Sequence, residues 1–102
     1  MKRIREPKIL EAARDEVCAL RFDGCQGRIG VVWAHSNAPE DGKAMGTKAD
    51  DIFGCFACHH CHDILDGRKK GPSSEYIGYR FTRAMKESWR RLWLKGVIGV
   101  LD

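Results

Sequence analysis

Three stretches of the chain have the character of helices. Residues 8–16 follow Pro7 and place their apolar side chains on one side of a short helix. Residues 58–66 open a second helix with a run of cysteines and histidines. The longest pattern covers residues 74–95, where an apolar stripe runs from Ile77 to Leu92 and most basic residues lie off it. We expect Gly96 to end this amphipathic helix.

Two short runs of β-forming residues precede the cysteine-rich segment. Residues 18–22 and residues 31–35 each have strand character, and the dipeptide Asp23-Gly24 between them is typical of a hairpin turn. We therefore predict that the two runs pair as a hairpin. Residues 36–51 are rich in turn-forming residues, which predicts a long irregular loop; such loops in small domains are usually functional or mobile.

Length and composition indicate one globular domain over residues 1–102. Hydrophobic residues make up 43% of the chain and charged residues 31%, a balance unlike that of disordered or membrane proteins. No apolar stretch could span a bilayer, and the basic N-terminus lacks the apolar segment of a signal peptide. We expect a cytoplasmic protein with a flexible N-terminus (1–7), a metal-stabilised core (8–67) and a basic amphipathic helix (73–96).

Positive charge is concentrated in the last third of the chain. The overall formal charge is +4, yet residues 68–95 carry 9 basic and only 2 acidic side chains. This suits a polyanionic partner such as nucleic acid, although a solvated helix face explains the charge equally well. If nucleic acid binds here, the expected phosphate contacts are Arg68, Lys69, Lys70, Arg80, Arg83, Lys86, Arg90 and Arg91.

The three tryptophans, Trp33, Trp89 and Trp93, could stack on bases. Their spacing is more typical of core residues, and we expect them in the core.

Two cysteine pairs have the spacing of a metal site. Cys18 and Cys25 bracket the predicted turn, and Cys58 and Cys61 form a CxxC motif at a helix start. In a reducing compartment such cysteines are better metal ligands than disulfide partners. Zinc takes four tetrahedral ligands, so the two pairs predict one structural zinc ion. Cys55 is taken as the spare cysteine, because the other CxxC is followed directly by a histidine; a redox or free-thiol role for some cysteines is the alternative.

The segment from Cys58 to Asp63, with the earlier cysteine pair and the dipeptide Ala34-His35, resembles the HNH (ββα-metal) nucleases. The likeness is closer to small phage and prophage nucleases of that superfamily, through Gly46-Thr47-Lys48 and the tail from Trp93 to Ile98, and it covers most of residues 8–98. It implies an α+β fold with a small zinc-stabilised, treble-clef-like ββα core, an N-terminal helix and a long basic C-terminal helix.

The resemblance further implies a metal-dependent DNA endonuclease, encoded by a phage or prophage and acting in the host cytoplasm. It assigns the general base to His35 and a ligand of a catalytic divalent ion, Mg²⁺ or Mn²⁺, to His62. Phosphodiester hydrolysis needs an activated water and positive charge beside the phosphate, and such residues supply both. The alternatives are a structural, hydrogen-bonded His35 and a His62 that ligates the structural zinc.

Two departures from the superfamily pattern concern the active site. Ala34 occupies the position that commonly supplies a second metal ligand, and the asparagine that often orients the base has no clear counterpart. The candidate replacements are Asp50, Asp51, Asp63 and Asp66. Two other functions therefore stay open: a zinc-stabilised module of the same fold that binds DNA without cleaving it, and a structural protein whose tail, residues 96–101, docks a partner. The oligomeric state is not predicted.

Overall fold

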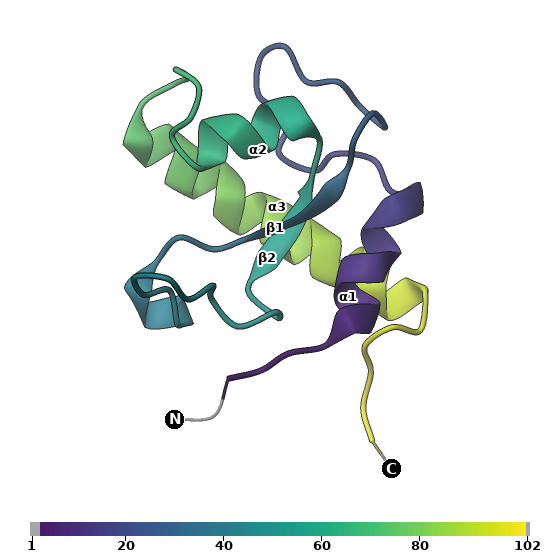
Figure 1. The fold of residues 1–102 in the computed structure, drawn as a ribbon. Helices are drawn as coiled ribbons and strands as arrows, with labels where there is room; N and C mark the ends of the chain where they lie inside the picture. The colour runs from purple at the N-terminus through teal and green to yellow at the C-terminus, as the bar shows by residue number, and fades with distance from the viewer. Residues whose placement is uncertain (1–2, 102) are drawn as a thin grey trace.

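Three α-helices surround one two-stranded antiparallel sheet in residues 3–101, the part of the chain that the computed structural model describes (Figure 1). The predicted α+β class is therefore confirmed. No helix in this part is long and apolar enough to cross a membrane. In chain order the elements are α1 (Pro7–Glu11), the 3₁₀ helix η1 (Ala12–Asp15), β1 (Val32–His35), the 3₁₀ helix η2 (Pro39–Asp41), β2 (Gly54–Ala57), α2 (His59–Leu65) and α3 (Ser74–Leu94).

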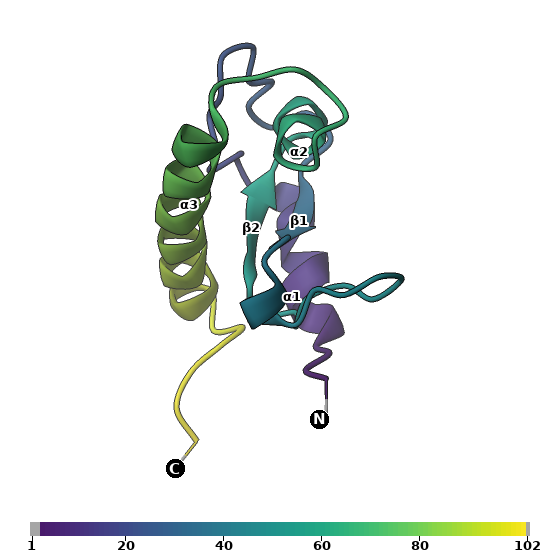
Figure 2. The same ribbon diagram turned by 90° about the vertical axis from the view of Figure 1, so that its left-hand side faces the viewer.

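The sheet lies between α3 on one side and α1 and α2 on the other (Figure 2). The core stripe of α3 packs on β2, where the Ser88 hydroxyl accepts a hydrogen bond from the backbone N–H of Phe56 at 3.1 Å. The carbonyl of Phe56 accepts from the N–H of Ala19 at 2.8 Å. The backbone N–H and C=O of Phe56 both lie at the edge of the sheet, and both are thereby hydrogen-bonded, as a buried sheet edge requires.

Residues 18–22 do not form the predicted strand. Arg21 has a φ of 55° and Gly24 a φ of 87°, and the N–H of Cys18 donates to the carbonyl of Gly27 at 2.9 Å, so the chain closes a loop here. The predicted hairpin is therefore wrong. Residues 32–35 instead pair with residues 54–57, with His35 opposite Gly54.

Capping residues set the ends of the last two helices. The Cys58 sulfur accepts from the N–H of Cys61 at the start of α2, and Ser73 caps α3 through the N–H of Tyr76. Gly96, with a φ of 76°, follows α3 as expected. Beyond it, residues 97–98 pack on the core, whereas residues 100–101 are exposed.

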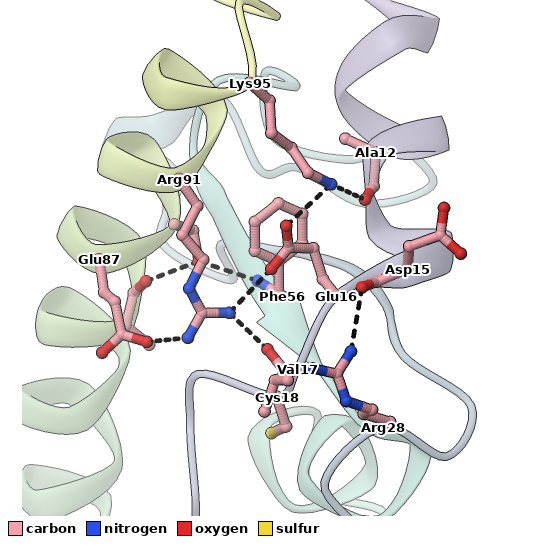
Figure 3. A network of polar contacts seen from close by, with 12 residues as sticks. Ala12, Asp15, Glu16, Val17, Cys18, Arg28, Phe56, Glu87, Arg91 and Lys95 are labelled. Carbon is pink, nitrogen blue, oxygen red and sulfur yellow. Dashed lines mark hydrogen bonds and ion pairs between the residues drawn. The ribbon is translucent and has the colours of Figure 1, made fainter.

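Side chains of α3 hold the segment between η1 and the first cysteine (Figure 3). Arg91 donates to the carbonyl of Val17 at 2.6 Å and pairs with Glu16 at 3.1 Å. Lys95 pairs with the same carboxylate at 2.8 Å. Arg80 donates to two backbone carbonyls that follow Cys18, at 2.8 and 3.0 Å. These bonds replace the strand pairing that the sequence predicted for this segment.

Candidate functional site

The structure brings together the four cysteines whose spacing predicted a metal site. The sulfur atoms of Cys18, Cys25, Cys58 and Cys61 all lie within 4.8 Å of one another. The Cys25 and Cys58 sulfurs are 3.9 Å apart, far longer than a disulfide bond and close to the ~3.8 Å that separates two thiolates on one tetrahedral zinc ion. Backbone N–H groups of residues 26 and 27 point at two of these sulfurs. The set fits a tetrahedral metal ion.

Metals bind thiolates, and one thiol of the cluster, that of Cys18, favours the thiolate form. A hydrogen bond from Cys61, opposed by burial, lowers the pKa of the Cys18 thiol to about 4. The same contact raises the pKa of Cys61. Cys55 is fully buried outside the cluster, and burial raises the pKa of its thiol. Its assignment as the spare cysteine agrees with this position.

His35 ends β1 beside a buried carboxylate. Its Nε2 lies 2.8 Å from Oδ1 of Asp51, whose side chain is only 6% exposed. A carboxylate accepts hydrogen bonds, so Nε2 is the donor of this contact; in the neutral imidazole with this tautomer the lone pair lies on Nδ1. Of the four aspartates considered from the sequence, Asp51 is therefore the one that contacts His35.

The N-terminal segment and a tryptophan hold Asp51 in place. Oδ2 of Asp51 accepts from the backbone N–H of Glu6 at 2.6 Å, and Arg5 lies 3.6 Å from Oδ1. The carbonyl of Asp51 accepts from Nε1 of the buried Trp33 at 2.8 Å. Its neighbour Asp50 instead accepts from the N–H of Ile4 at 3.3 Å. Sequence spacing gave no sign that residues 4–6 support this carboxylate.

His62 forms a second pair one turn along α2. Its Nε2 lies 3.1 Å from Oδ2 of Asp66, and the two side chains are 23% and 19% exposed. Asp66 also accepts from Asn37 at 3.0 Å and from Arg68 at 3.0 Å. Burial lowers the pKa of His62, which favours the neutral imidazole that can ligate a metal. Asp63 lies outside this pair and contacts Arg68 at 3.1 Å.

The imidazoles of His35 and His62 line one cavity of about 240 Å³, although His35 belongs to β1 and His62 to α2. The lining residues that carry polar chemistry are His35, Ser36, Asn37, Lys43, Lys48, His62, Asp66 and Arg68. Sequence reasoning did not single out Asn37 or Lys43, and it used Lys48 only as part of a motif. All three lie in the irregular loop between the strands. The prediction of that long loop was the sequence signal that could have pointed to them. The cavity can offer a base, acidic and imidazole ligands, and cations to a phosphate.

Ala34 faces away from this cavity. Its side chain is fully buried with Cys55 and Ala57 in the core, because neighbouring strand residues point to opposite faces. A metal-ligating side chain at position 34 would therefore project into the core. Any ligands for a second ion would have to come from other residues, and His62 and Asp66 both line the cavity.

The basic residues expected to contact phosphates fall into three groups. Arg80 and Arg91 are engaged with backbone carbonyls inside the chain. Arg68 lines the cavity, and Lys69 lies beside His60, whose Nε2 contacts the carbonyl of Asp23. The exposed remainder is Lys70, Arg83, Lys86 and Arg90.

Two of the three tryptophans lie where the sequence predicted. Trp33 is buried, and Trp89 packs on the core and donates to the carbonyl of Ile52 at 2.8 Å. Trp93 is 54% exposed, so its assignment to the core was wrong. It sits beyond the edge of the apolar stripe of α3. His59, which lies between two cysteines of the cluster, is also exposed.

Comparison with known proteins supports a nuclease family. A family model described as "Putative nuclease YbcO" matches residues 7–93. A solved structure described as a putative bacteriophage protein from Escherichia coli str. K-12 substr. MG1655 superposes with a TM-score of 0.68 at 28% sequence identity, covering 85% of this chain and 98% of that chain. No curated protein matches the chain. Because the family model spans well over half of its residues, the chain belongs to the family described as "Putative nuclease YbcO".

Proposed function

We propose that the chain is a metal-dependent endonuclease of the HNH type that hydrolyses DNA phosphodiester bonds. The observation that carries this proposal is the cavity shared by His35 and His62. One imidazole is held by a buried carboxylate and the other is paired with an acidic residue on a helix. Membership of a family described as nucleases supports nucleic acid as the substrate.

His35 is the proposed general base. With Nε2–H donated to Asp51, Nδ1 is free to accept a proton from the attacking water. The water oxygen then bonds to phosphorus, and the bond from phosphorus to one ester oxygen breaks. The buried carboxylate keeps the ring in one tautomer and stabilises the imidazolium that forms, so Asp51 acts through His35 and not on the substrate.

His62 and Asp66 are the proposed ligands of a catalytic divalent ion, Mg²⁺ or Mn²⁺. Imidazole and carboxylate are suitable donors for such ions, and both groups face the cavity. When bound, the ion would supply positive charge for the phosphate and the leaving oxygen. Arg68 holds Asp66 from the other side, while Lys43 and Lys48 add cations to the cavity wall. We propose these three basic residues, with Lys69 and Lys70 nearby, as phosphate contacts.

For the four-cysteine cluster we propose a structural zinc ion. Four thiolates with no open position are typical of structural sites, whereas a catalytic site keeps one position for water or substrate. Zinc would join the loop of residues 18–25 to the start of α2. Because His62 directly follows the ligand Cys61, the ion would also help to fix the position of His62.

A plasmid-nicking assay tests the function. Wild-type protein with Mg²⁺ or Mn²⁺ is expected to convert supercoiled plasmid to open-circular and linear forms. His35→Ala is expected to slow this conversion about 10²–10⁴-fold while zinc content and DNA binding stay unchanged. Equal nicking by wild type and variant, at equal purity, would remove His35 from the mechanism and point to a contaminating nuclease.

Ala34 favours a second candidate, a zinc-stabilised DNA-binding module without catalysis. Its methyl group supplies no ligand, and it lies in the core. If wild type binds duplex DNA in a gel shift but fails to nick plasmid with either ion, this second function becomes the better one.

A further inference from the structure

A strip of exposed aromatic and basic side chains runs along α3 on the side opposite its core stripe. Its members are Tyr76, Tyr79, Arg83, Lys86, Arg90 and Trp93, hereafter the α3 strip. Their alternating spacing of three and four residues places all six on one helix face. The buried residues Ala84, Ser88 and Leu92 lie about half a turn away, against the sheet.

The three aromatic rings of the strip are unusually exposed. Tyr76, Tyr79 and Trp93 are 47%, 56% and 54% exposed, although such rings normally bury most of their area. Tyr76 and Tyr79 have ring centroids 6.2 Å apart at the start of the helix, and Trp93 stands at its other end. Aromatic rings thus flank the basic residues at both ends.

The cations between these rings have no acidic partner. Within residues 3–101, no carboxylate pairs with Arg83, Lys86 or Arg90. The nearby Glu87 is already bound by Arg21 and Arg91. The guanidinium of Arg83 instead lies 5.7 Å from the ring centroid of Tyr79. The strip therefore presents uncompensated positive charge, which calls for an anionic partner.

We propose that the α3 strip is a second nucleic-acid surface and that its ligand is a single strand. Lys and Arg side chains contact phosphates without sequence preference. Exposed rings stack on bases only where the bases are free of a duplex, and stacking tolerates any base. From Tyr79 to Trp93 the helix rises about 21 Å, enough to follow several nucleotides. An anionic membrane could take both the charge and the rings, but membership of a family described as nucleases favours nucleic acid as the ligand.

The strip and the candidate cavity lie on different sides of the sheet. α3 covers one side, while the cavity is lined from β1, α2 and the loop between the strands on the other (Figure 2). Nucleotides bound to the strip are therefore different from the nucleotide whose phosphate would lie in the cavity. If the cavity cleaves DNA as proposed, the strip holds a single-stranded segment that flanks the cleaved bond; this part of the assignment rests on the proposed function.

Fluorescence anisotropy with a labelled oligothymidine of about 20 nucleotides tests this assignment. The protein carries His35→Ala so that the probe is not cut. Arg83→Gln with Arg90→Gln is expected to weaken binding about tenfold and to reduce the log–log salt slope by about 1.4, because each single-strand phosphate contact contributes about 0.7. The charge-matched control, Lys8→Gln with Arg28→Gln, removes two exposed cations outside the strip and should leave both quantities unchanged.

Ring removal tests the preference for a single strand. Tyr79→Leu with Trp93→Leu should weaken oligothymidine binding roughly tenfold and leave binding of an equally long duplex unchanged. Equal losses on both probes, or parental binding by the arginine variant, would overturn the proposal. So would strip-dependent binding to phosphatidylglycerol vesicles without oligothymidine binding. Plasmid nicking by strip variants that retain His35 reads out the proposed function separately: an inactive wild type refutes the nuclease and leaves the anisotropy result standing.

Discussion

Oδ1 of Asp51 lies 2.8 Å from Nε2 of His35, and its other oxygen accepts the backbone N–H of Glu6. One carboxylate therefore accepts two hydrogen bonds at once, from a candidate base and from the N-terminal segment. Each bond uses a different oxygen, so in this geometry both carboxylate oxygens act as acceptors. The contact links residues 6, 35 and 51, which are far apart in sequence, and sets which imidazole nitrogen faces the carboxylate.

Replacing Asp51 with asparagine should reduce nicking about 10²-fold or more. The amide keeps the size of the side chain but has one acceptor oxygen, so either Glu6 N–H or the imidazole loses its partner. If the amide NH₂ turns toward His35, the ring takes the other tautomer and Nδ1 no longer accepts a proton. Initial nicking rates at saturating Mn²⁺ measure this effect.

Asp50→Asn is the matched control for this prediction. Asp50 also accepts a backbone N–H from the N-terminal segment, but it has no contact with a histidine. Its substitution should leave the nicking rate within a few-fold of wild type. The combined variant of Asp51→Asn and His35→Ala should be no slower than His35→Ala alone, because both changes act through one group. An additive loss would give Asp51 an independent role.

Cys58→Ser together with Cys61→Ser should remove bound zinc and unfold the chain. The lost ion would no longer join residues 18–25 to α2, and structural zinc contributes directly to folding. Elemental analysis should find one zinc per chain in wild type and none in this variant, and circular dichroism should show lost helix. Cys55→Ala is the control and should retain zinc. Zinc loss in Cys55→Ala, or retention in the double variant, contradicts the four-cysteine site.

The sequence predicted helices well because their evidence is local. The apolar stripe of α3 and the caps at both of its ends lie within one segment, and the helix is found at residues 74–94. The cysteine cluster was also predictable, since ligand spacing near a turn and a helix start encodes it. Residues 18–22 were mispredicted because their backbone bonds go to distant groups, among them Arg80 and Phe56. No local pattern could reveal those partners.

The candidate site was predictable in part for the same reason. His35 and His62 stand at a strand end and a helix start, which the sequence marks. Asp51 was one of four aspartates that spacing could not separate, because its selection depends on the register that sets β1 against β2. The exposure of Trp93 was equally hidden: its neighbour Leu92 is fully buried, and the sequence alone does not show how far around the helix the core extends beyond the apolar stripe.

His62→Ala and His35→Ala should both slow nicking strongly, but for different reasons. If His62 ligates a catalytic ion, its loss should raise the Mn²⁺ concentration needed for half-maximal activity, whereas His35→Ala should leave that concentration unchanged. Both variants should keep the four-cysteine zinc, because neither histidine belongs to that cluster. Residual activity titrated against Mn²⁺, with zinc measured in parallel, separates the roles. Release of zinc by His62→Ala would place the histidine in the structural site.

The ion pair of Glu87 with Arg21 should make folding stability depend on pH in the acid range. The hydrogen bond from Arg21, at 2.6 Å, holds the pKa of Glu87 below its ordinary value of 4.5. A carboxyl whose pKa is lower in the folded chain stabilises folding above its unfolded pKa, and this contribution is lost as pH falls through the folded value. Glu87→Gln should therefore cost about 1 kcal/mol at pH 7, where solvent screens a partly exposed pair, and progressively less below pH 4.5.

Urea denaturation of both chains at pH 7 and at stepwise lower pH measures this difference. A metal ion bound by the four cysteines would also be lost in acid, but that loss is common to both chains and cancels in the comparison. Glu11→Gln is the control, since Glu11 is exposed and has no ion pair within residues 3–101. Its difference from wild type should stay near zero at every pH. A constant difference for Glu87→Gln across the range would mean that packing, and not the charge pair with Arg21, accounts for its effect.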